Sequence, residues 1–429
     1  MSPSRGNSSE SPGLLLTFKA LLERRLSNST LRQLTISPAD SVDFSSNDYL
    51  SLAPSPSFQS AFQKELAALQ PTFPIGSTGS RLLDGNSSYA ENLEREIAAF
   101  HNAPAALLFN SGFEANVGIF SCIPQPGDVI IYDEYIHASV HDGMRLSRAK
   151  SCKAFAHNSI ADFRKVLQSF IDADPLLITG KSNVIIAVES VYSMDGDTCP
   201  LKEFVSSVES MLPAGNGYII VDEAHSTGVF GQDGRGFVSA LGMEDRIFAR
   251  LHTFGKALAC NGAAVLCPPL MKQYLVNYAR SLIYTTSLSY PSLASIKAVY
   301  RLMKEGQINP LQSQLWATIR TFHSRLDALA KKSPPQLLRT FDEAPKSQIL
   351  ALLTSRPRSL AKYCQKHGYI VRAIVPPTVP AGAERVRVCL HASTTEEELE
   401  GLLQRIEEWV ETKRLELEHP AEARPKAML

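Results

Sequence analysis

Short apolar runs alternate with amphipathic stretches over the middle of the chain. The apolar runs, rich in β-branched residues, are Asp128–Tyr132, Asn183–Val188, Tyr218–Val221 and Ala263–Leu266. Apolar residues recur at helical spacing in the stretches between them, 89–100, 160–170 and 201–211. Continuously apolar strands are typical of a sheet that is buried on both faces. The pattern therefore predicts an α/β fold with a mostly parallel, doubly wound sheet.

The two ends of the chain differ from this middle part. Leu14–Leu26 has the spacing of a helix, and the pattern changes again near Gln307. The segments predicted after that point are a long helix, two strands and a final helix: Leu311–Lys331, Gln348–Leu353, Arg385–Leu390 and Thr395–Glu416. We therefore predict three parts: a disordered lead-in with a helix (1–44), a large domain (45–306) and a smaller C-terminal α+β domain (307–429).

Composition and charge exclude several classes of protein. The chain has 429 residues and balances 43 Lys and Arg against 43 Asp and Glu, so no overall charge predicts binding to nucleic acid. No apolar run approaches the roughly 20 residues that cross a bilayer. Seven scattered cysteines without a CxxC pair argue against a disulfide framework and a structural zinc site. We expect no metal, no nucleic acid and no membrane partner.

The chain ends bear on localisation. The polar first residues lack the apolar core of a secretory signal, so we expect a cytoplasmic protein. The last three residues, Ala-Met-Leu, show a weak similarity to the peroxisomal S-K-L address without its central basic residue.

Polar side chains follow four strand-like runs. Asp222 and His225 come after 218–221, Ser193 after 183–188, His137 after 128–132, and Lys256 after 250–253. The carboxyl ends of parallel strands meet at one edge of a sheet, where functional groups gather. A lysine and an acidic residue at one edge suit pyridoxal 5'-phosphate (PLP), because the lysine holds the aldehyde and the acid keeps the pyridine nitrogen protonated.

Each of these residues also has a simpler interpretation. Asp222 alone suits a helix N-cap, His225 a satisfied core histidine, and Lys256 a solvated turn residue. Asn110–Asn116 predicts a turn that opens a helix, where an anion binds, although an ordinary cap has the same composition. The coincidence of groups at several strand ends favours a functional site.

Several motifs, taken in order, carry a resemblance to a known family. They are Asp43–Leu50, Gly76–Arg81, Asn110–Asn116, His137–Ser139, Ser193–Asp197, Asp222–His225, Gly234–Gly236 and Thr253–Lys256. Together they resemble the α-oxoamine synthases, PLP enzymes of fold type I related in architecture to aspartate aminotransferase, over about 14–411. The resemblance implies an acyltransferase that condenses an amino acid with an acyl thioester and releases CO2. It also implies a homodimer with shared active sites.

The resemblance implies roles for individual residues around PLP. Lys256 would hold the aldehyde and Asp222 the pyridine nitrogen, while His225 and Ser193 would lie near the ring hydroxyl and His137 on the ring face. The residues implied for the phosphate are Ser111, Gly112, Phe113 and Thr253, with Thr286 from the neighbouring subunit.

The resemblance also implies substrate-binding residues. Asn47 and Arg387 would bind the carboxylate of the amino acid, and Arg32 would line the entrance for the acyl thioester. Within the family, Arg280–Ser287 and Pro376–Pro380 with Arg385–Arg387 resemble members that use L-alanine and pimeloyl-CoA, or a pimeloyl carrier thioester. Those members make 8-amino-7-oxononanoate, a precursor of biotin.

Four positions depart from the family pattern. Ser51 and Ala259 stand where glycine is usual, Ala90 replaces a histidine, and Val375 replaces an arginine. We interpret the first three as structural. Val375 leaves the acyl chain open, so a related synthase that condenses glycine or serine with another acyl-CoA, as in secondary metabolism, stays an alternative.

Two other classes are less consistent with the sequence. Asp222–His225 spells the DEAH string of helicase ATPases, but the nearest candidate phosphate loop, Pro175–Ser182, begins with proline in place of glycine. An inactive regulatory homologue is a further possibility, against which the intact Lys256 argues.

Overall fold

The computed structural model describes residues 13–28, 30–69, 73–341, 343–376 and 378–418. Contacts divide the chain into two units, Met1–Ser41 and Val42–Leu429. The predicted disordered lead-in, as far as residue 12, and the C-terminal Ala-Met-Leu lie outside the described residues.

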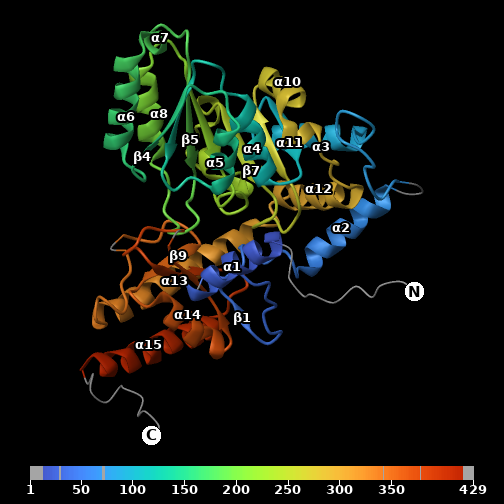
Figure 1. The fold of residues 1–429 in the computed structure, drawn as a ribbon. Coiled ribbons are helices and arrows are strands. Elements are labelled where there is room, and N and C mark those ends of the chain that lie inside the picture. Colours follow the sequence, from blue (N-terminus) through green and yellow to red (C-terminus); the bar gives the residue numbers. More distant parts are fainter. Residues whose placement is uncertain (1–12, 29, 70–72, 342, 377, 419–429) are drawn as a thin grey trace, which may run out of the picture. The chain divides into compact units, whose positions relative to one another are not determined.

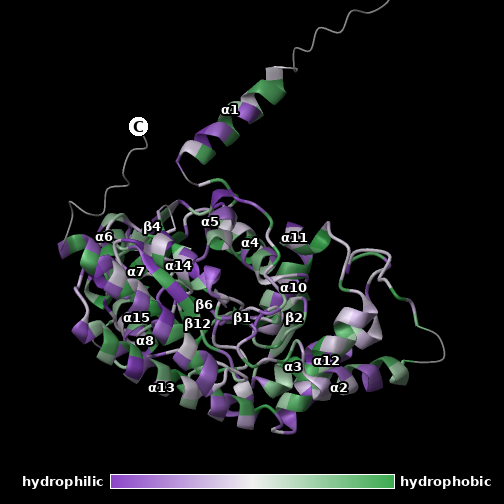
Figure 2. Ribbon diagram, turned by 90° about the horizontal axis from the view of Figure 1, so that it is seen from below, coloured by the Kyte–Doolittle hydropathy of each residue, from purple (hydrophilic) through white to green (hydrophobic). Residues whose placement is uncertain are grey.

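Among its described residues, the first unit contains one helix, α1 (Gly13–Ser27), which confirms the helix predicted at 14–26. Arg24 and Arg25 lie in its last turn, where positive charge is favourable near the free carbonyl groups. None of its residues is buried within the unit, and apolar and polar residues follow one another along it (Figure 2).

The second unit is built around a seven-stranded sheet in the order β2-β8-β7-β6-β5-β3-β4. All neighbouring strands are parallel except those beside β8, which runs antiparallel to β2 and β7. The strands are β2 (Ala105–Phe109), β3 (Val129–Asp133), β4 (Ser151–Phe155), β5 (Val184–Glu189), β6 (Gly217–Asp222), β7 (Ala249–Thr253) and β8 (Ala263–Cys267). The predicted mostly parallel sheet is confirmed.

Helices cover both faces of this sheet. In Figure 1, α6 and α8 stand on one side and α4, α10 and α11 on the other. The helices before α6 are α2 (Pro56–Ala68), α3 (Ser88–Phe100), α4 (Gly112–Cys122) and α5 (Ala138–Arg145). Those that follow are α6 (Ile160–Ala173), α7 (Pro175–Ile178), α8 (Leu201–Met211), α9 (Phe237–Ala240), α10 (Pro269–Tyr278), α11 (Arg280–Ile283) and α12 (Tyr290–Lys304), with 3-10 turns η1 (Gln232–Gly234) and η2 (Glu244–Arg246).

The side chains of β3 show why the strands are apolar along their whole length. Val129 and Ile131 join a buried cluster with Phe163 of α6, whereas Ile130 joins the cluster on the opposite face with Ile119 of α4. Successive residues of a strand point to opposite faces, so a strand between two helical layers needs apolar residues at every position. This arrangement is the doubly wound fold that the sequence predicts.

The C-terminal part adds a three-stranded antiparallel sheet in the order β11-β12-β9. Its elements are α13 (Asn309–Lys332), β9 (Ile349–Leu353), α14 (Pro357–Lys366), β10 (Tyr369–Ile370), β11 (Arg372–Ile374), β12 (Arg385–Cys389) and α15 (Glu396–Glu418). The predicted long helix, two strands and final helix are confirmed. In Figure 2, α13 and α15 carry both polar and apolar residues, as expected of helices with one buried face.

The segment after residue 41 is held by this C-terminal part. β1 (Val42–Asp43) pairs in parallel with β10, and the ring of Phe44 stacks on that of Phe322 at 6.5 Å. The backbone N–H of Cys389 donates to the carbonyl of Phe44. These contacts fix the position of the chain that leads to Asn47. The predicted domain boundaries, between residues 44 and 45 and between residues 306 and 307, stay predictions.

Two departures from the family pattern have a backbone explanation. Ser51 and Ala259 both have a positive φ, of 54° and 50°. This left-handed region is free for glycine but costs other residues roughly 1–2 kcal/mol. The resemblance places glycine at both positions, which is the residue that this conformation favours.

We expect Ala259→Gly to raise the free energy of unfolding by up to about 1 kcal/mol, because the strain at positive φ is relieved. Gly242 provides a control in which the free energy of unfolding should change in the opposite direction. Its φ is 63°, and an added Cβ would meet no atom within 4 Å, so only backbone strain is introduced. Gly242→Ala should therefore lower the free energy of unfolding by about 1 kcal/mol through backbone strain alone. Urea unfolding of both variants tests this, and a destabilised Ala259→Gly would contradict it.

Candidate active site

The predicted site residues gather where strands of the large sheet end. Asp222 is the last residue of β6 and lies opposite Glu189, the last residue of β5. Thr253 ends β7, three residues before Lys256, and His137 caps the N-terminus of α5 after β3. The parallel strands thus deliver these side chains to one edge, as sequence reasoning expects.

A chain of hydrogen bonds links Lys256 to the predicted substrate residues. The Nζ atom of Lys256 lies 2.8 Å from His225 Nε2, and His225 Nδ1 lies 2.8 Å from the Tyr49 hydroxyl. Tyr49 donates to Asn47 Oδ1 at 3.0 Å, and that oxygen also accepts from Arg387 Nη2 at 2.6 Å. The structure therefore brings Lys256, His225, Asn47 and Arg387 together through Tyr49.

The direction of these bonds fixes the protonation of His225. Asn47 Oδ1 can only accept, so the single hydroxyl proton of Tyr49 is used there. His225 Nδ1 must then donate to the Tyr49 oxygen, which leaves Nε2 as the acceptor for Lys256. Burial, with the positive charge of Lys256, holds the pKa of His225 well below its usual range, so the ring is neutral as this assignment requires.

Lys256 is more acidic than an ordinary lysine. Burial lowers its pKa, the charge of Asp222 opposes this most strongly, and the result is a pKa of about 8. An amine with this pKa is partly neutral near pH 7, and only the neutral form acts as a nucleophile or a base.

A second chain of contacts connects Asp222 with His137. Asn116 donates from Nδ2 to Asp222 Oδ2 at 2.8 Å and to the Ser139 hydroxyl at 3.0 Å. Ser139 lies 2.7 Å from His137 Nδ1 through its hydroxyl and donates its backbone N–H to the same atom. His137 Nδ1 is therefore an acceptor, and Nε2 carries the proton of the neutral ring. Burial, together with the charge of Lys256, lowers the pKa of His137.

Sequence reasoning missed several buried members of the site. Tyr49, Asn116, Ser139 and Glu189 all contact or flank predicted residues. Burial and the nearby charge of Asp222 raise the pKa of Glu189 well above its usual range, so its side chain is a neutral acid. Glu189 directly follows a predicted strand, as Asp222 does, and this position in the sequence could have indicated it. Tyr49 and Asn116 lie within the quoted motifs without a role.

The predicted phosphate residues surround the N-terminus of α4. Ser111 is its N-cap and accepts from Glu114 N at 3.1 Å. A Cβ at Gly112 would lie 3.4 Å from Thr253 Oγ1, at van der Waals contact, so Gly112 and Thr253 lie side by side. Asn110 donates to the carbonyl of Thr286 at 2.7 Å, which places Thr286 beside the same helix within one chain. The ring of Phe113 meets His137 edge-on at 6.3 Å.

Two predicted residues lie apart from these contacts. Ser193 occupies the turn between β5 and α8 and is partly buried. Arg32 is an exposed residue of the N-terminal unit, and its role at the acyl-thioester entrance stays a prediction.

The residues present fit PLP. The partly neutral Lys256 suits the aldehyde, and the carboxylate of Asp222, held by Asn116, suits the pyridine nitrogen. The N-terminus of α4, with glycine at its first position, suits the phosphate. Within the described ranges, no group of three or more His, Cys, Asp or Glu side chains is arranged to hold a metal ion. No helix of the described chain is both long and apolar enough to cross a bilayer.

We expect covalent capture of Lys256 by PLP, followed by borohydride, to quicken as the pH rises through about 8, because the neutral amine then predominates. Asp222 raises the pKa of Lys256, so Asp222→Asn should move the midpoint to lower pH. Mass spectrometry of the labelled peptide measures both midpoints, with the peptide of the exposed Lys202 as control. A midpoint near 10.5, the ordinary value, would contradict the burial of the amine.

Known proteins share both the sequence and the fold. Residues 39–406 match the family model described as aminotransferase class I and II. An 8-amino-7-oxononanoate synthase from Emericella nidulans is 57% identical over 395 residues, 92% of this chain and 95% of its own. The aminoacyl transferase sphA of Aspergillus fumigatus is 38% identical, over 92% of this chain and 87% of its own.

A solved serine palmitoyltransferase with PLP superimposes with a TM-score of 0.80 and 25% identity, over 94% of this chain and 99% of that one. The predicted fold type I architecture and PLP-dependent enzyme class are confirmed. The chain belongs to the class I and II aminotransferase family, and within it to the α-oxoamine synthases, which are PLP-dependent acyltransferases.

Proposed function

We propose that the protein condenses L-alanine with pimeloyl-CoA, or with a pimeloyl carrier thioester, in biotin synthesis. The products are 8-amino-7-oxononanoate, CO2 and the free thiol. The observation that carries the proposal is the high identity to a fungal 8-amino-7-oxononanoate synthase over nearly the whole chain. The contacts of Arg387, Asn47 and Lys256 are consistent with it.

Four groups of residues would hold the cofactor. Lys256 would bind the aldehyde, Asp222 the pyridine nitrogen, and the N-terminus of α4 the phosphate, with Ser193 and His225 near the ring hydroxyl. When bound, PLP supplies an electron-accepting ring that stabilises negative charge at the α-carbon of the amino acid. Because Asn116 donates to Asp222, the carboxylate keeps one orientation toward the nitrogen.

Lys256 is the proposed base for the α-proton. Its pKa of about 8 leaves a fraction of the amine neutral at pH 7. The amine can therefore take a proton from carbon and return it after CO2 has left. His225 Nε2 accepts a hydrogen bond from Lys256, which holds the amine in place between these steps.

Arg387 and Asn47 would bind the carboxylate of alanine. Arg387 lies in β12 and donates to Asn47 Oδ1, so the guanidinium is oriented before a substrate arrives. A guanidinium matches a carboxylate with two parallel hydrogen bonds. The Asn47 side chain is oriented by Tyr49 on its other side.

His137 would donate a hydrogen bond to the thioester carbonyl or to the departing carboxylate. Its Nδ1 atom accepts from Ser139, so the proton of the neutral ring is on Nε2. A donor that is already oriented strengthens as charge develops on the oxygen of a reacting carbonyl.

We also propose a homodimer with a shared active site. Large exposed apolar side chains flank the residues near Thr286, among them Ile75, Leu83 and Tyr284. Contiguous exposed apolar surface is typical of protein–protein interfaces. The contribution of Thr286 from a neighbouring subunit rests on the family resemblance.

A second candidate is a synthase for another acyl chain. The relation to sphA and to serine palmitoyltransferase supports it, as does Val375 in place of the family arginine. The nearby Arg372 donates from Nε to Ser45 at 3.0 Å, so this side chain is already engaged beside the Asn47 segment. Thiol release from a panel of acyl-CoAs with alanine, glycine and serine distinguishes the candidates.

With pimeloyl-CoA, we expect thiol release with L-alanine to exceed that with glycine or serine by at least about tenfold, the discrimination that one methyl or hydroxyl group provides. Lys256→Ala should keep the fold and release no thiol, because the aldehyde partner and the base are lost together. Activity with palmitoyl-CoA and serine alone would favour the second candidate. Turnover by Lys256→Ala would contradict both.

Asp222→Asn should lower the rate by orders of magnitude while the circular dichroism spectrum stays unchanged, because an amide cannot keep the ring nitrogen charged. Asp172, an exposed residue of α6, gives a matched control, and Asp172→Asn should leave the rate unaltered. A rate for Asp222→Asn within twofold of the parent would contradict the proposed role.

A further inference from the structure

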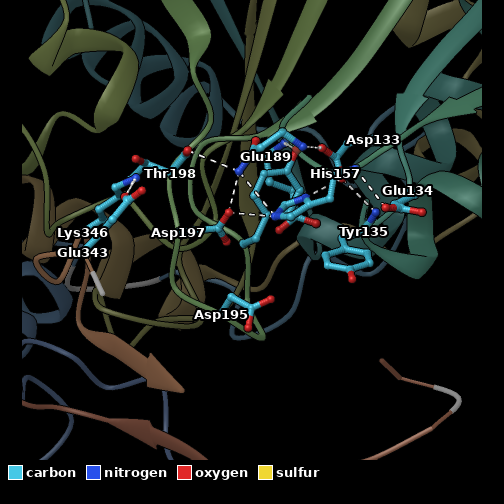
Figure 3. A network of polar contacts seen from close by, with 12 residues as sticks. Asp133, Glu134, Tyr135, His157, Glu189, Asp195, Asp197, Thr198, Glu343 and Lys346 are labelled. Carbon is cyan, nitrogen blue, oxygen red and sulfur yellow. Dashed lines mark hydrogen bonds and ion pairs between the residues drawn. The ribbon is translucent and has the colours of Figure 1, made fainter. Parts of the chain in front are cut away.

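A partly buried histidine joins the sheet to the turn that carries Ser193. The imidazole of His157, which follows β4, lies 2.8 Å from Asp133 Oδ1 through Nδ1 and 2.7 Å from Asp197 Oδ2 through Nε2 (Figure 3). Asp133 is the last residue of β3 and is fully buried. Asp197 belongs to the turn after β5. One ring thus connects two carboxylates from separate parts of the fold.

The histidine at the centre of this cluster is cationic. Burial alone would lower the pKa of His157, but the hydrogen bonds and charges of Asp133 and Asp197 outweigh it and raise the pKa to about 9. Both ring nitrogens then carry protons and both donate to a carboxylate. Asn158 strengthens the cluster, since its backbone N–H donates to Asp133 at 2.8 Å and its side chain to Asp197.

Other groups enclose the ring on its remaining sides. The ring of Tyr135 stacks on it at 4.4 Å, and Tyr192 meets it edge-on at 4.5 Å. Glu134 accepts from the backbone N–H of His157 at 2.9 Å. The carboxylates of Asp133 and Asp197 contact the imidazole, that of Glu134 bonds to the His157 backbone, and no described cation contacts the ring.

The turn itself is a tight loop with few other supports. Tyr192 N donates to the carbonyl of Asp197 and Gly196 N to that of Tyr192, which closes residues 192–197 on themselves. One side of the turn borders a cavity of about 580 Å³ that Asp195, Asp197, His157 and the far wall at His323 line. Side-chain packing cannot hold the turn on the side where this cavity lies.

Two contacts hold the tip of the turn from the C-terminal sheet. Asp195 forms an ion pair with Arg385 of β12, and Gly196 lies so close to the carbonyl of Ile349 that no side chain fits. The base of the turn, at Asp197, has its ionic attachment to the large sheet through His157. Ser193 belongs to the same turn, which the backbone hydrogen bonds of Tyr192 with Asp197 and Gly196 close.

We propose that Asp133, His157 and Asp197 form a charged clamp that holds the 192–197 turn, and that His157 is a positioning residue for Ser193 at the cofactor. This inference rests on the proposed contact of Ser193 with PLP. The three residues of the clamp contact neither substrate nor cofactor. The clamp changes the affinity for PLP through the position of Ser193.

The clamp has a defined pH dependence. His157 has a raised pKa in the folded protein, so the stabilisation is complete below the ordinary value of 6.5 and is lost as the pH rises through about 9. Above that pH the neutral ring donates to only one of the two carboxylates. The ionic attachment of Asp197 is then lost, and the base of the turn keeps only the side-chain bond from Asn158.

The test is a double-mutant cycle in which the affinity of the apoenzyme for PLP is measured. It compares the parent with His157→Gln, Ser193→Ala and the double variant. At pH 7.5 we expect each single variant to weaken PLP binding by about tenfold, the effect of one hydrogen bond to a charged group. The double variant should bind no more weakly than Ser193→Ala, because the clamp acts through Ser193. At pH 10 the difference between His157→Gln and the parent should disappear.

His323→Gln, on the far wall of the same cavity, is the matched control and should bind PLP as the parent does. Should His157→Gln fail to fold, Asp197→Asn replaces it, since the buried pair of His157 with Asp133 is then kept. Parent-like affinity of His157→Gln, or additive losses in the double variant, would overturn the clamp. If His157→Gln weakens PLP binding but Ser193→Ala does not, the proposed action through Ser193 is overturned. If the parent protein binds no PLP, the proposed function is overturned instead.

Discussion

The site depends on the amine of Lys256, which is shielded from water but has no carboxylate as its direct hydrogen-bond partner. Lys256 is partly buried and its hydrogen-bond partner is a neutral histidine, so desolvation outweighs the charge of Asp222 and the pKa falls to about 8. A direct ion pair would have kept the lysine protonated and unreactive. The neutral His225 has one proton, on Nδ1, and donates it to the Tyr49 hydroxyl. That hydroxyl donates its own proton to Asn47 Oδ1.

Glu189 contributes to the same balance from the neighbouring strand. It lies opposite Asp222 in the sheet, and two buried carboxylates at this separation cannot both be ionised at low cost. Burial and the charge of Asp222 raise the pKa of Glu189 well above its usual range, so Glu189 is a neutral acid beside the lysine. At this edge of the sheet, the environment therefore changes the ionisation of Lys256 and of Glu189.

Sequence patterns predicted the elements that are apolar throughout or clearly amphipathic. β5, β6, α6, α8, α13 and α15 were found within a few residues of their observed ends. β4 was missed because it is an edge strand with Cys152 and Lys153 exposed, and β2 because its alanines resemble those of a helix. For the site, strand ends indicated Lys256, Asp222, His225 and His137. They could not indicate Tyr49 or His157, whose roles arise from contacts with residues 176 and 40 positions away.

The pairing of Asn47 with Arg387 has a consequence for synthesis of the protein. These residues are 340 positions apart, and the strand that holds Asn47 in place is bonded to residues of β10 and β12. A ribosome therefore has to complete nearly the whole polypeptide before the amino-acid pocket can form. Premature termination or proteolysis before β12 would leave Lys256 in place, yet remove the guanidinium of Arg387 that is proposed to bind the substrate carboxylate.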